Sequence, residues 1–395
     1  MDYKKESVSL HKHYQGKLAI TSKVPLFDKK DLSLAYTPGV AGVCEAILED
    51  KEKLYTHTIK GNCVAVITDG SAVLGLGNIG SAAGLPVMEG KAILFKEFAG
   101  IDAFPICLAS QDVRLTIATI KNIAPVFGGI NLEDIKAPEC FVIENALQDI
   151  GIPVMHDDQH GTAVVVLAGM INALKVKKRD ISEVKFVVNG AGAAGVAITR
   201  LLLSYGAKGL HFIICDSKGM IYFGREDFSH APEKQELSQK TNLARKKGNL
   251  EDALRGADVF IGVSKKDLVT KIMVKSMAKD PIIFAMANPD PEILPKDAKD
   301  AGALIVATGR SDFPNQVNNV LVFPGIFRGA LDVRATKITE NMKIAAAEAI
   351  AAMIPEPKAE EIIPSPLNKD VALKVSEAVQ KAWKEEIFAQ TAIEN

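Results

Sequence analysis

The sequence has few cysteines, no long apolar run and no surplus of either charge. Its 395 residues include 5 cysteines, which are widely spaced and form no C-x-x-C pair. This pattern argues against a disulfide framework or a zinc site and is typical of buried free thiols in a reducing cytoplasm. No segment reaches the roughly 18 apolar residues that a transmembrane helix needs, and the N-terminus lacks the apolar core of a signal peptide. We therefore expect a cytoplasmic protein without a membrane partner.

The charges are nearly balanced. Lys and Arg number 47 and Asp and Glu number 48, for a net charge of −1. A chain without a basic surplus or stripe is a poor ligand for phosphate backbones, so nucleic acid is not the expected partner. Apolar residues make up 48% and charged residues 24%, which is the ordinary balance of a globular protein. The length favours two domains.

Val- and Ile-rich segments alternate with helical patterns along most of the chain. Because these segments lack polar alternation, we expect parallel strands that are covered on both faces, and hence an α/β fold. Strands are predicted at 62–69, 102–109, 124–134, 152–158, 184–192, 210–216, 257–264, 281–289 and 303–309. Helices are predicted at 90–100, 138–151, 161–178, 193–206, 343–354 and 371–387.

A glycine-rich turn follows one of these strands and opens a helix. Residues 190–195 read GAGAAG and match the dinucleotide fingerprint G-x-G-x-x-G. Gly190 permits the tight turn, Gly192 lets the pyrophosphate approach the backbone, and Gly195 lets the helix pack on the strand. This context predicts a Rossmann-type site, with contacts from Asn189, Gly190, Gly192, Ala193, Ala194 and Gly195.

Asp216 ends the next predicted strand and bears on the choice of cofactor. Its carboxylate is expected to accept hydrogen bonds from the adenosine ribose and to repel a 2′-phosphate, which favours NAD. Ser217 and Lys218 follow directly, and a lysine at that place could neutralise a 2′-phosphate. NADP therefore stays possible.

Two pairs of carboxylates follow two successive predicted strands. Glu133 and Asp134 end one unit, and Asp157 and Asp158 end the next. Carboxyl ends of neighbouring parallel strands meet at one edge of a sheet, where four carboxylates would repel each other without a cation. Oxygen ligands alone favour Mg²⁺ or Mn²⁺. The nearby His156 and His160 straddle a strand–helix junction, so we interpret them as supporting residues rather than zinc ligands.

Several ordered motifs are spread over essentially the whole chain. They are YTPGV (36–40), TDGSAVLGLGNIG (68–80), GKAILFKEFAGI (90–101), NLEDIKAP (131–138), HDDQHGTA (156–163), GAGAAG (190–195), ANPDPE (287–292) and NNVLVFPGIFRGAL (318–331). Together they resemble malic enzyme in its short bacterial-type form. The resemblance implies an oxidoreductase that converts L-malate to pyruvate and CO₂ with NAD(P)⁺ and a divalent cation. Decarboxylation of oxaloacetate is an expected side activity.

The same resemblance assigns roles to particular residues. It implies Tyr36 and Lys91 as the catalytic pair and Asp157 as the carboxylate that supports the lysine. The metal ligands are then Glu133, Asp134 and Asp158, and the substrate contacts are Lys91, Asn288, Asn318 and Ser71, with Asn288 also near the cofactor. Lys91 can act as a base only when neutral, and burial together with the adjacent cation is expected to lower its pKa.

One position departs from the family pattern. Longer eukaryotic members carry a carboxylate-binding arginine where this chain has Ala72. Another group must then hold that carboxylate, and Ser71, Asn288, Asn318 and the metal are the candidates. Two other functions stay open on the sequence: a metal-independent, amino-acid-dehydrogenase-like oxidoreductase, and an inactive nucleotide-binding regulator.

The alternation of strands and helices also predicts the domain organisation. We expect an N-terminal substrate and metal domain at 1–157, to which 319–395 returns, and a Rossmann domain at 158–318. The polar segment 1–60, which carries Tyr36, is too short to hold its own core. We expect it to pack on a second subunit and to complete that subunit's site, so the protein is predicted to be a homodimer or a larger homo-oligomer.

Overall fold

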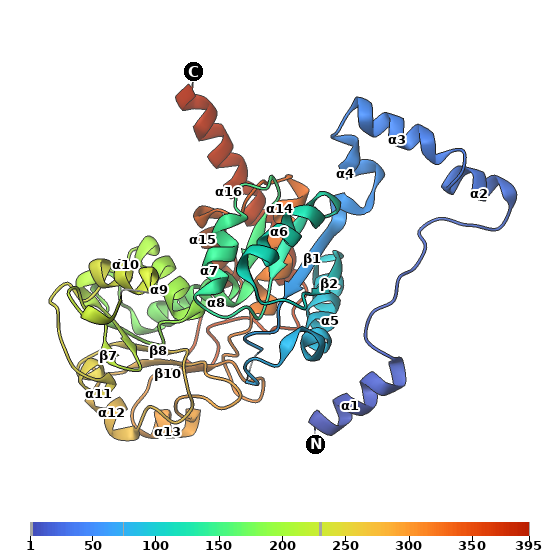
Figure 1. Cartoon of the computed structure of the whole chain (residues 1–395). Helices are drawn as coiled ribbons and strands as arrows, with labels where there is room; N and C mark the ends of the chain where they lie inside the picture. Colours follow the sequence, from blue (N-terminus) through green and yellow to red (C-terminus); the bar gives the residue numbers. More distant parts are fainter. Residues whose placement is uncertain (1–2, 74, 229–230, 395) are drawn as a thin grey trace.

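The computed structural model describes residues 3–73, 75–228 and 231–394. Four short helices form an N-terminal arm that stands away from the rest of the chain (Figure 1). They are α1 (Tyr3–Tyr14), α2 (Lys29–Ala35), α3 (Val40–Glu49) and α4 (Lys53–His57). The remainder contains two sheets with helices on their faces, which confirms the predicted α/β class.

The first sheet has four parallel strands. Their order is β2 (Asp102–Cys107), β1 (Cys63–Thr68), β3 (Gly129–Leu132) and β4 (Val154–His156). The helices α5 (Gly80–Ala99), α6 (Val113–Ile123) and α7 (Glu139–Ala146) connect these strands. Every residue of β1, β3 and β4 is buried, as expected for strands that are covered on both faces. The carboxyl ends of β3 and β4 are therefore neighbours.

The second sheet has six strands and the Rossmann arrangement. The order is β10 (Ile305–Thr308), β9 (Ile282–Ala285), β8 (Val259–Gly262), β5 (Phe186–Asn189), β6 (Phe212–Asp216) and β7 (Gly219–Met220), with only β7 antiparallel. Its helices are α9 (Ala193–Tyr205), α10 (Pro232–Lys240), α11 (Leu250–Leu254), α12 (Lys271–Ser276) and α13 (Pro295–Asp300). The chain reverses its direction of winding after β5 and β6, and ligands bind at such a switch point.

The long apolar helix α8 (Asp157–Lys177) leads from the first sheet to the second. Three further helices follow the second sheet: α14 (Phe323–Asp332), α15 (Glu340–Ala352) and α16 (Asp370–Glu394). The chain does return to the first sheet, because the ring of Phe95 on α5 packs against Phe323 and Phe327 on α14, with centroids 4.8 and 5.4 Å apart. The predicted domain boundaries at 157 and 318 remain a prediction.

Two predicted helix starts are wrong. Helix α8 begins at Asp157 rather than at Gly161, so both aspartates lie in its first turn, where the helix dipole favours negative charge. Helix α5 begins at Gly80 and continues through Gly90, which was expected to start it. Burial of side chains such as Met88 offsets the low helix propensity of glycine. The helix stops as predicted at Gly100, whose φ is +65°.

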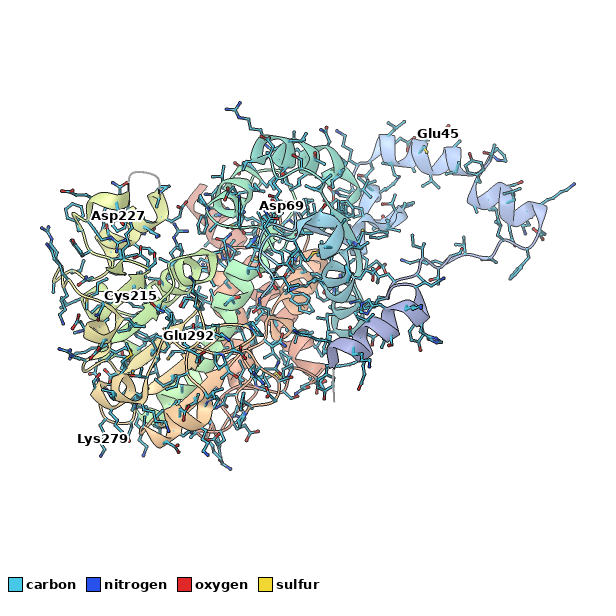
Figure 2. All side chains as sticks on the ribbon, turned by 60° about the horizontal axis from the view of Figure 1, so that its bottom comes forward. Glu45, Asp69, Cys215, Asp227, Lys279 and Glu292 are labelled. Atoms are coloured by element: carbon cyan, nitrogen blue, oxygen red, sulfur yellow. The ribbon has the colours of Figure 1, made fainter. Side chains whose placement is uncertain are left out.

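The N-terminal arm contributes nothing to the core. None of its four helices contains a buried residue, and Phe27 and Ile20 are 92% and 89% exposed. The arm touches the body at a few polar points, such as Lys17 Nζ, which donates to the carbonyl oxygen of Pro86 at 2.6 Å. In Figure 2, the labelled Glu45 of the arm lies well apart from Asp69 of the first sheet region.

The cysteines and the hydropathy of the helices largely follow the sequence expectations. All five cysteines are free, and Cys63, Cys140 and Cys215 are buried as expected. Cys44 is exposed because it lies on the arm, so its predicted burial is wrong for the single chain. Within the described ranges, none of the helices combines the length and the hydropathy that a bilayer span requires.

Candidate active site

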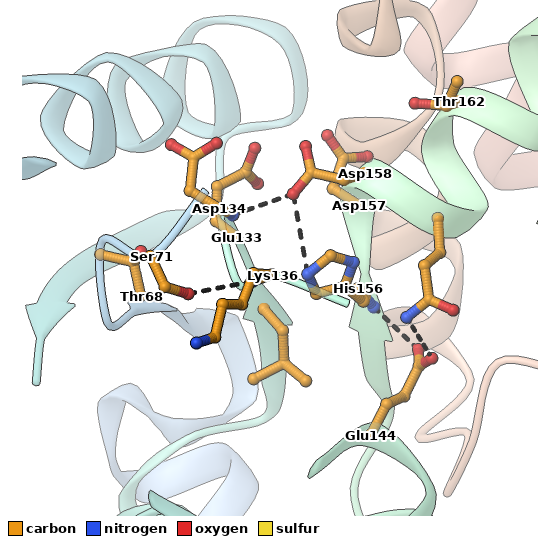
Figure 3. A network of polar contacts seen from close by, with 12 residues as sticks. Thr68, Ser71, Glu133, Asp134, Lys136, Glu144, His156, Asp157, Asp158 and Thr162 are labelled. Atoms are coloured by element: carbon orange, nitrogen blue, oxygen red, sulfur yellow. Dashed lines mark hydrogen bonds and ion pairs between the residues drawn. The ribbon is translucent and has the colours of Figure 1, made fainter. Parts of the chain in front are cut away.

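Three carboxylates converge where β3 and β4 end. Glu133 and Asp134 follow β3, and Asp158 lies in the first turn of α8 after β4, so the parallel order brings them together (Figure 3). One oxygen from each lies within 4.8 Å of the other two. The backbone N–H of Asp134 donates to Asp158 Oδ2 at 2.9 Å, which fixes the two loops relative to each other. The predicted metal ligands therefore form one cluster.

The cluster carries more negative charge than its surroundings neutralise. Burial, together with the nearby Asp158, Asp157 and Asp134, holds the pKa of Glu133 well above its ordinary value, although Lys91 opposes this. Asp134 adopts a φ of +52°, which is unusual for a residue other than glycine. An oxygen-only set of three close carboxylates suits Mg²⁺ or Mn²⁺, so the residues fit the divalent cation that the sequence predicts.

Lys91 on α5 lies at the edge of this cluster. Its Nζ is 2.6 Å from Asp157 Oδ2 and 2.9 Å from Glu133 Oε1, and it sits 4.3 Å from the ring centre of Phe323. Burial disfavours the ammonium, but the two carboxylates outweigh it and hold the pKa of Lys91 above its ordinary value. Among the protein groups, the two carboxylates thus favour charged Lys91. The predicted neutral amine depends on the adjacent cation, whose positive charge opposes that of the ammonium, and stays a prediction.

The glycine-rich turn lies at the wall of a cavity of about 880 Å³. Asn189, Gly190, Gly192 and Asp216 line this cavity from the second sheet, and Ala137, Pro138 and Phe141 line it from the α7 region of the first. Three predicted contacts in the same motif, Ala193, Ala194 and Gly195, form the first turn of α9, so the helix N-terminus lies beside the cavity.

The glycines play the parts that the fingerprint predicts. A Cβ on Gly195 would lie 1.8 Å from the carbonyl oxygen of Gly190, and one on Gly190 would lie 2.7 Å from that of Val263. Gly190 also has a φ of +121°. A Cβ on Gly192 would meet nothing within 4 Å, so the backbone there is open to a ligand. The turn fits a dinucleotide pyrophosphate.

Comparisons with known proteins agree with this geometry. The family models described as the malic enzyme N-terminal domain and the malic enzyme NAD-binding domain match residues 15–115 and 159–383. The chain belongs to the malic enzyme family. It is 58% identical to a bifunctional malic/malolactic enzyme of Bacillus subtilis, over 100% of this chain and 96% of that one. It is 55% identical to the NAD-dependent malic enzyme of Geobacillus stearothermophilus, over 94% of this chain and 77% of that one.

Solved malic enzymes share the fold over almost the whole chain. The NAD-dependent malic enzyme of Thermotoga maritima superposes with a TM-score of 0.92 at 51% identity, covering 95% of this chain and 98% of that one. The malic enzyme of Pyrococcus horikoshii superposes with a TM-score of 0.94 at 49% identity, covering 97% of this chain and 91% of that one. By contrast, this chain spans about half of the NADP-dependent malic enzyme of Escherichia coli, to which it is 49% identical.

Of the predicted substrate contacts, Lys91 lies on α5, whereas the other three lie on different loops. Ser71 is buried, and its hydroxyl accepts a hydrogen bond from the backbone N–H of Lys136 at 2.9 Å (Figure 3). Asn288 is partly buried, and its Nδ2 donates to the carbonyl oxygen of Met286 at 3.3 Å. Asn318 uses its Oδ1 to accept from the N–H of Val320. Their contacts with malate remain a prediction.

Asn319 is a site residue that the sequence analysis missed. Its Nδ2 donates to Asp157 Oδ2 at 3.1 Å, the same oxygen that contacts Lys91. Asn319 thus helps to orient the carboxylate that holds the lysine, while its neighbour Asn318 caps the short turn at Asn319–Leu321. In the sequence, two adjacent asparagines indicate that this segment could contribute an amide to the site. The sequence alone does not show which of the two faces the site.

Glu144 on α7 is a second residue that was missed. Although burial would raise the pKa of this carboxyl, its contacts with His160 and His156 hold the pKa below its ordinary value. It accepts from the backbone N–H of His156 at 2.8 Å (Figure 3). It also accepts from Gln159 Nε2 at 3.1 Å and from His160 Nε2 at 3.1 Å. These donors flank the aspartates at the start of α8, so His156 and His160 do support the carboxylate cluster, as predicted.

Tyr36 lies on the N-terminal arm, outside the body that carries the other predicted site residues. It follows α2 on the arm and is 68% exposed, whereas Lys91 lies on α5 of the body (Figure 1). Within one chain, the tyrosine is not part of the cluster of Lys91, Asp157 and Glu133. That the arm serves a second subunit stays a prediction.

Proposed function

We propose that this chain oxidises L-malate and decarboxylates the product to pyruvate and CO₂, with reduction of NAD(P)⁺ and with Mg²⁺ or Mn²⁺ as the metal. Family membership over the whole chain supports the reaction. The observation that carries the assignment of the site is the position of Lys91, which lies between Asp157 and Glu133 at the edge of a three-carboxylate cluster.

The chain offers separate places for its two cofactors. Glu133, Asp134 and Asp158 would hold the divalent cation, and the turn at 190–195 with the N-terminus of α9 would hold the pyrophosphate. When bound, the cation polarises the oxygens of malate and stabilises the negative charge that forms on decarboxylation, while NAD(P)⁺ accepts the hydride from C2.

Lys91 is the proposed base for the oxidation. Its amine takes the proton of the C2 hydroxyl, and Asp157 at 2.6 Å then stabilises the ammonium that results. Asn319 donates a hydrogen bond to the same oxygen of Asp157, which fixes the orientation of the carboxylate that contacts Lys91. The ring of Phe323 covers one side of the amine and limits the access of water.

The same pair completes the second half of the reaction. Loss of the C4 carboxylate leaves an enolate, which must gain a proton at C3 to give pyruvate. Tyr36 is the proposed acid for that step, while Lys91 returns its proton to the C2 oxygen and takes it back as the ketone forms. Ser71, Asn288 and Asn318 are the proposed contacts for the carboxylates of malate, because Ala72 offers no charge.

A direct test replaces Lys91 and compares it with a lysine on the same helix. Lys91→Ala is expected to abolish malate oxidation, since no other amine contacts Asp157 among the described residues. Lys96→Ala is the control, because Lys96 pairs with Asp102 away from the cluster and its side chain is 56% exposed. Full activity in Lys91→Ala would refute the assignment of the base.

We further propose that Tyr36 acts in the site of a second copy of this chain. The arm exposes apolar side chains such as Phe27 and Ile20, which need a surface to cover them. The body offers a cavity of about 750 Å³ beside α16, lined by Trp383, Ile387 and Phe388 among others. In a twofold dimer each arm would reach the body of its partner, and both sites would be complete.

Mixed subunits distinguish the two arrangements. We would co-refold Tyr36→Phe and Lys91→Ala chains, each of which is inactive alone. If Tyr36 acts on the partner, half of the dimers contain one intact site, and about a quarter of the wild-type rate returns. If Tyr36 acts within its own chain, every site lacks one member of the pair, and the mixture stays inactive. A fully active monomer in sedimentation would also refute the proposal.

A further inference from the structure

Glu292 is a buried carboxylate that lies between two loops of the candidate site. Its exposed fraction is 0%. Its Oε1 accepts from the backbone N–H of Ser264 at 3.1 Å, and its Oε2 accepts from the backbone N–H of Ala287 at 3.0 Å. These two N–H groups follow β8 and β9, which are neighbouring parallel strands. One carboxylate thus joins two strand ends at the edge of the sheet where ligands bind.

Both loops carry residues that the proposed reaction needs. Ser264 lines the cofactor cavity, and its hydroxyl oxygen accepts from Asn189 Nδ2 at 2.8 Å, just before the glycine-rich turn. Ala287 directly precedes Asn288, the proposed contact for a carboxylate of malate. Glu292 therefore links the wall of the cofactor cavity to the loop that carries the proposed substrate contact.

The surrounding backbone is shaped to receive these side chains. A Cβ on Gly262, the last residue of β8, would lie 2.3 Å from Cδ of Glu292. A Cβ on Gly309 would lie 2.9 Å from Nδ2 of Asn288. Figure 2 shows the labelled Glu292 in the interior of the molecule, whereas Lys279, which precedes β9 at the opposite end of the strand, lies at the edge. The site end of the sheet thus encloses Glu292 tightly.

The partners of Glu292 differ from those of an ordinary buried ion pair. Within the described ranges, no lysine or arginine forms an ion pair with it, and its oxygens accept from backbone N–H groups instead. Burial raises the pKa of this carboxyl, although the N–H groups oppose the effect. A carboxylate suits this place because its two oxygens can accept from two separate loops at once, whereas a side-chain amide has only one accepting oxygen.

We propose that Glu292 is a positioning residue, which holds the Ser264 wall of the cofactor cavity and the Asn288 loop at the separation that hydride transfer requires. The proposal rests on the malate oxidation proposed above and adds a residue that acts through two others. Transfer of a hydride from C2 of malate depends on the alignment of malate with the dinucleotide, and a misplacement of about 1 Å costs about a hundredfold in rate. A shift of one loop against the other changes this alignment.

Glu292→Gln tests the proposal with little change of volume. The amide oxygen can accept from one of the two backbone N–H groups, whereas the NH₂ group faces the other and cannot accept from it. One loop thus loses its anchor. We expect kcat for malate oxidation to fall at least about tenfold and KM for malate to change less than about threefold, because the binding groups remain while their alignment is lost.

Decarboxylation of added oxaloacetate separates positioning from stability, because this half of the reaction needs no hydride transfer. In Glu292→Gln we expect its rate to stay within about threefold of wild type, so the ratio of malate oxidation to decarboxylation falls. The control is Asp258→Asn at the opposite end of β8, where another buried carboxylate accepts from a backbone N–H, that of Lys185 at 3.1 Å. Asp258→Asn should lower the melting temperature and leave the ratio unchanged.

Gly262→Ala is a second variant, which displaces the carboxylate of Glu292 without removing it. We expect the same fall in the ratio of oxidation to decarboxylation. An unchanged kcat for malate in Glu292→Gln, or equal losses of oxidation and decarboxylation in either variant, would overturn the proposal and leave Glu292 a structural residue. Failure of the proposed function is distinguishable from these outcomes, because the wild type itself would then oxidise no malate.

Discussion

Replacing Glu144 with glutamine tests whether a buried carboxylate holds in place the turn that is proposed to bind the metal. The carboxylate accepts three hydrogen bonds from the turn that carries Asp157 and Asp158. In Glu144→Gln the amide oxygen can still accept from the N–H of His156. The new NH₂ group, however, faces Nε2 of Gln159 and of His160.

Both of these nitrogens are hydrogen-bond donors, so in the variant the NH₂ group of the glutamine faces two other donors and can accept from neither. The amide of Gln159 can only donate through Nε2. Lys343 Nζ lies 3.3 Å from Nδ1 of His160, which favours a proton on Nε2 of that ring. Two hydrogen bonds to a charged group are therefore lost, at about 1.5 kcal/mol or more each, which predicts about 3 kcal/mol of destabilisation.

The functional consequence should be weaker metal binding. Loss of a residue that supports metal ligands costs about 10–100-fold in affinity, so we expect Mn²⁺ to bind at least about tenfold more weakly in Glu144→Gln. Mn²⁺ titration followed by electron paramagnetic resonance and urea unfolding measure the two effects. The control is Glu139→Gln on the same helix, where the partly exposed pair with Lys136 is worth at most about 1 kcal/mol. An unchanged urea midpoint and an Mn²⁺ affinity within about twofold of wild type would refute the reasoning.

Two further predictions concern the lysine and the glycine turn. Asp157→Asn removes a carboxylate that raises the pKa of Lys91. Because the proposed base must be the neutral amine, the acid limb of the pH–rate profile should move to lower pH. A move to higher pH would contradict this. Gly195→Ala should lower the melting temperature, because its Cβ would lie 1.8 Å from the carbonyl oxygen of Gly190. Gly192→Ala should keep the wild-type melting temperature and weaken dinucleotide binding, because a Cβ there meets no protein atom within 4 Å. An equal drop in melting temperature in both variants would contradict an open backbone at Gly192.

The strands and the carboxylate cluster were accessible from the sequence. Buried parallel strands are continuous Val and Ile runs, and their carboxyl ends must meet at one edge, so strand order alone groups Glu133, Asp134 and Asp158. The glycine-rich turn at 190–195 could also be predicted, because each of its three glycines is required for a different steric reason. These features depend on local pattern and on a general rule of sheet topology.

The parts that escaped prediction depend on tertiary packing. Nothing in the sequence pairs Glu144 with a turn twelve residues away, because the partners are a backbone N–H and two polar side chains. The carboxylate of Asp216 likewise accepts hydrogen bonds from Arg225 and Lys234, which lie after β7 and on α10 and come close to it only in the folded chain. The course of α5 through Gly90 was missed because core burial outweighed local propensity.

The most direct test of the account follows the products of L-malate in the presence of Mn²⁺ and NADP⁺ or NAD⁺. Reduced cofactor and pyruvate should form in equal amounts, both should stop when the divalent cation is removed by a chelator, and oxaloacetate should not accumulate. Reduced cofactor accompanied by accumulating oxaloacetate, or a rate that does not depend on the divalent cation, would contradict the proposed oxidative decarboxylation at the site of Lys91 and the three carboxylates.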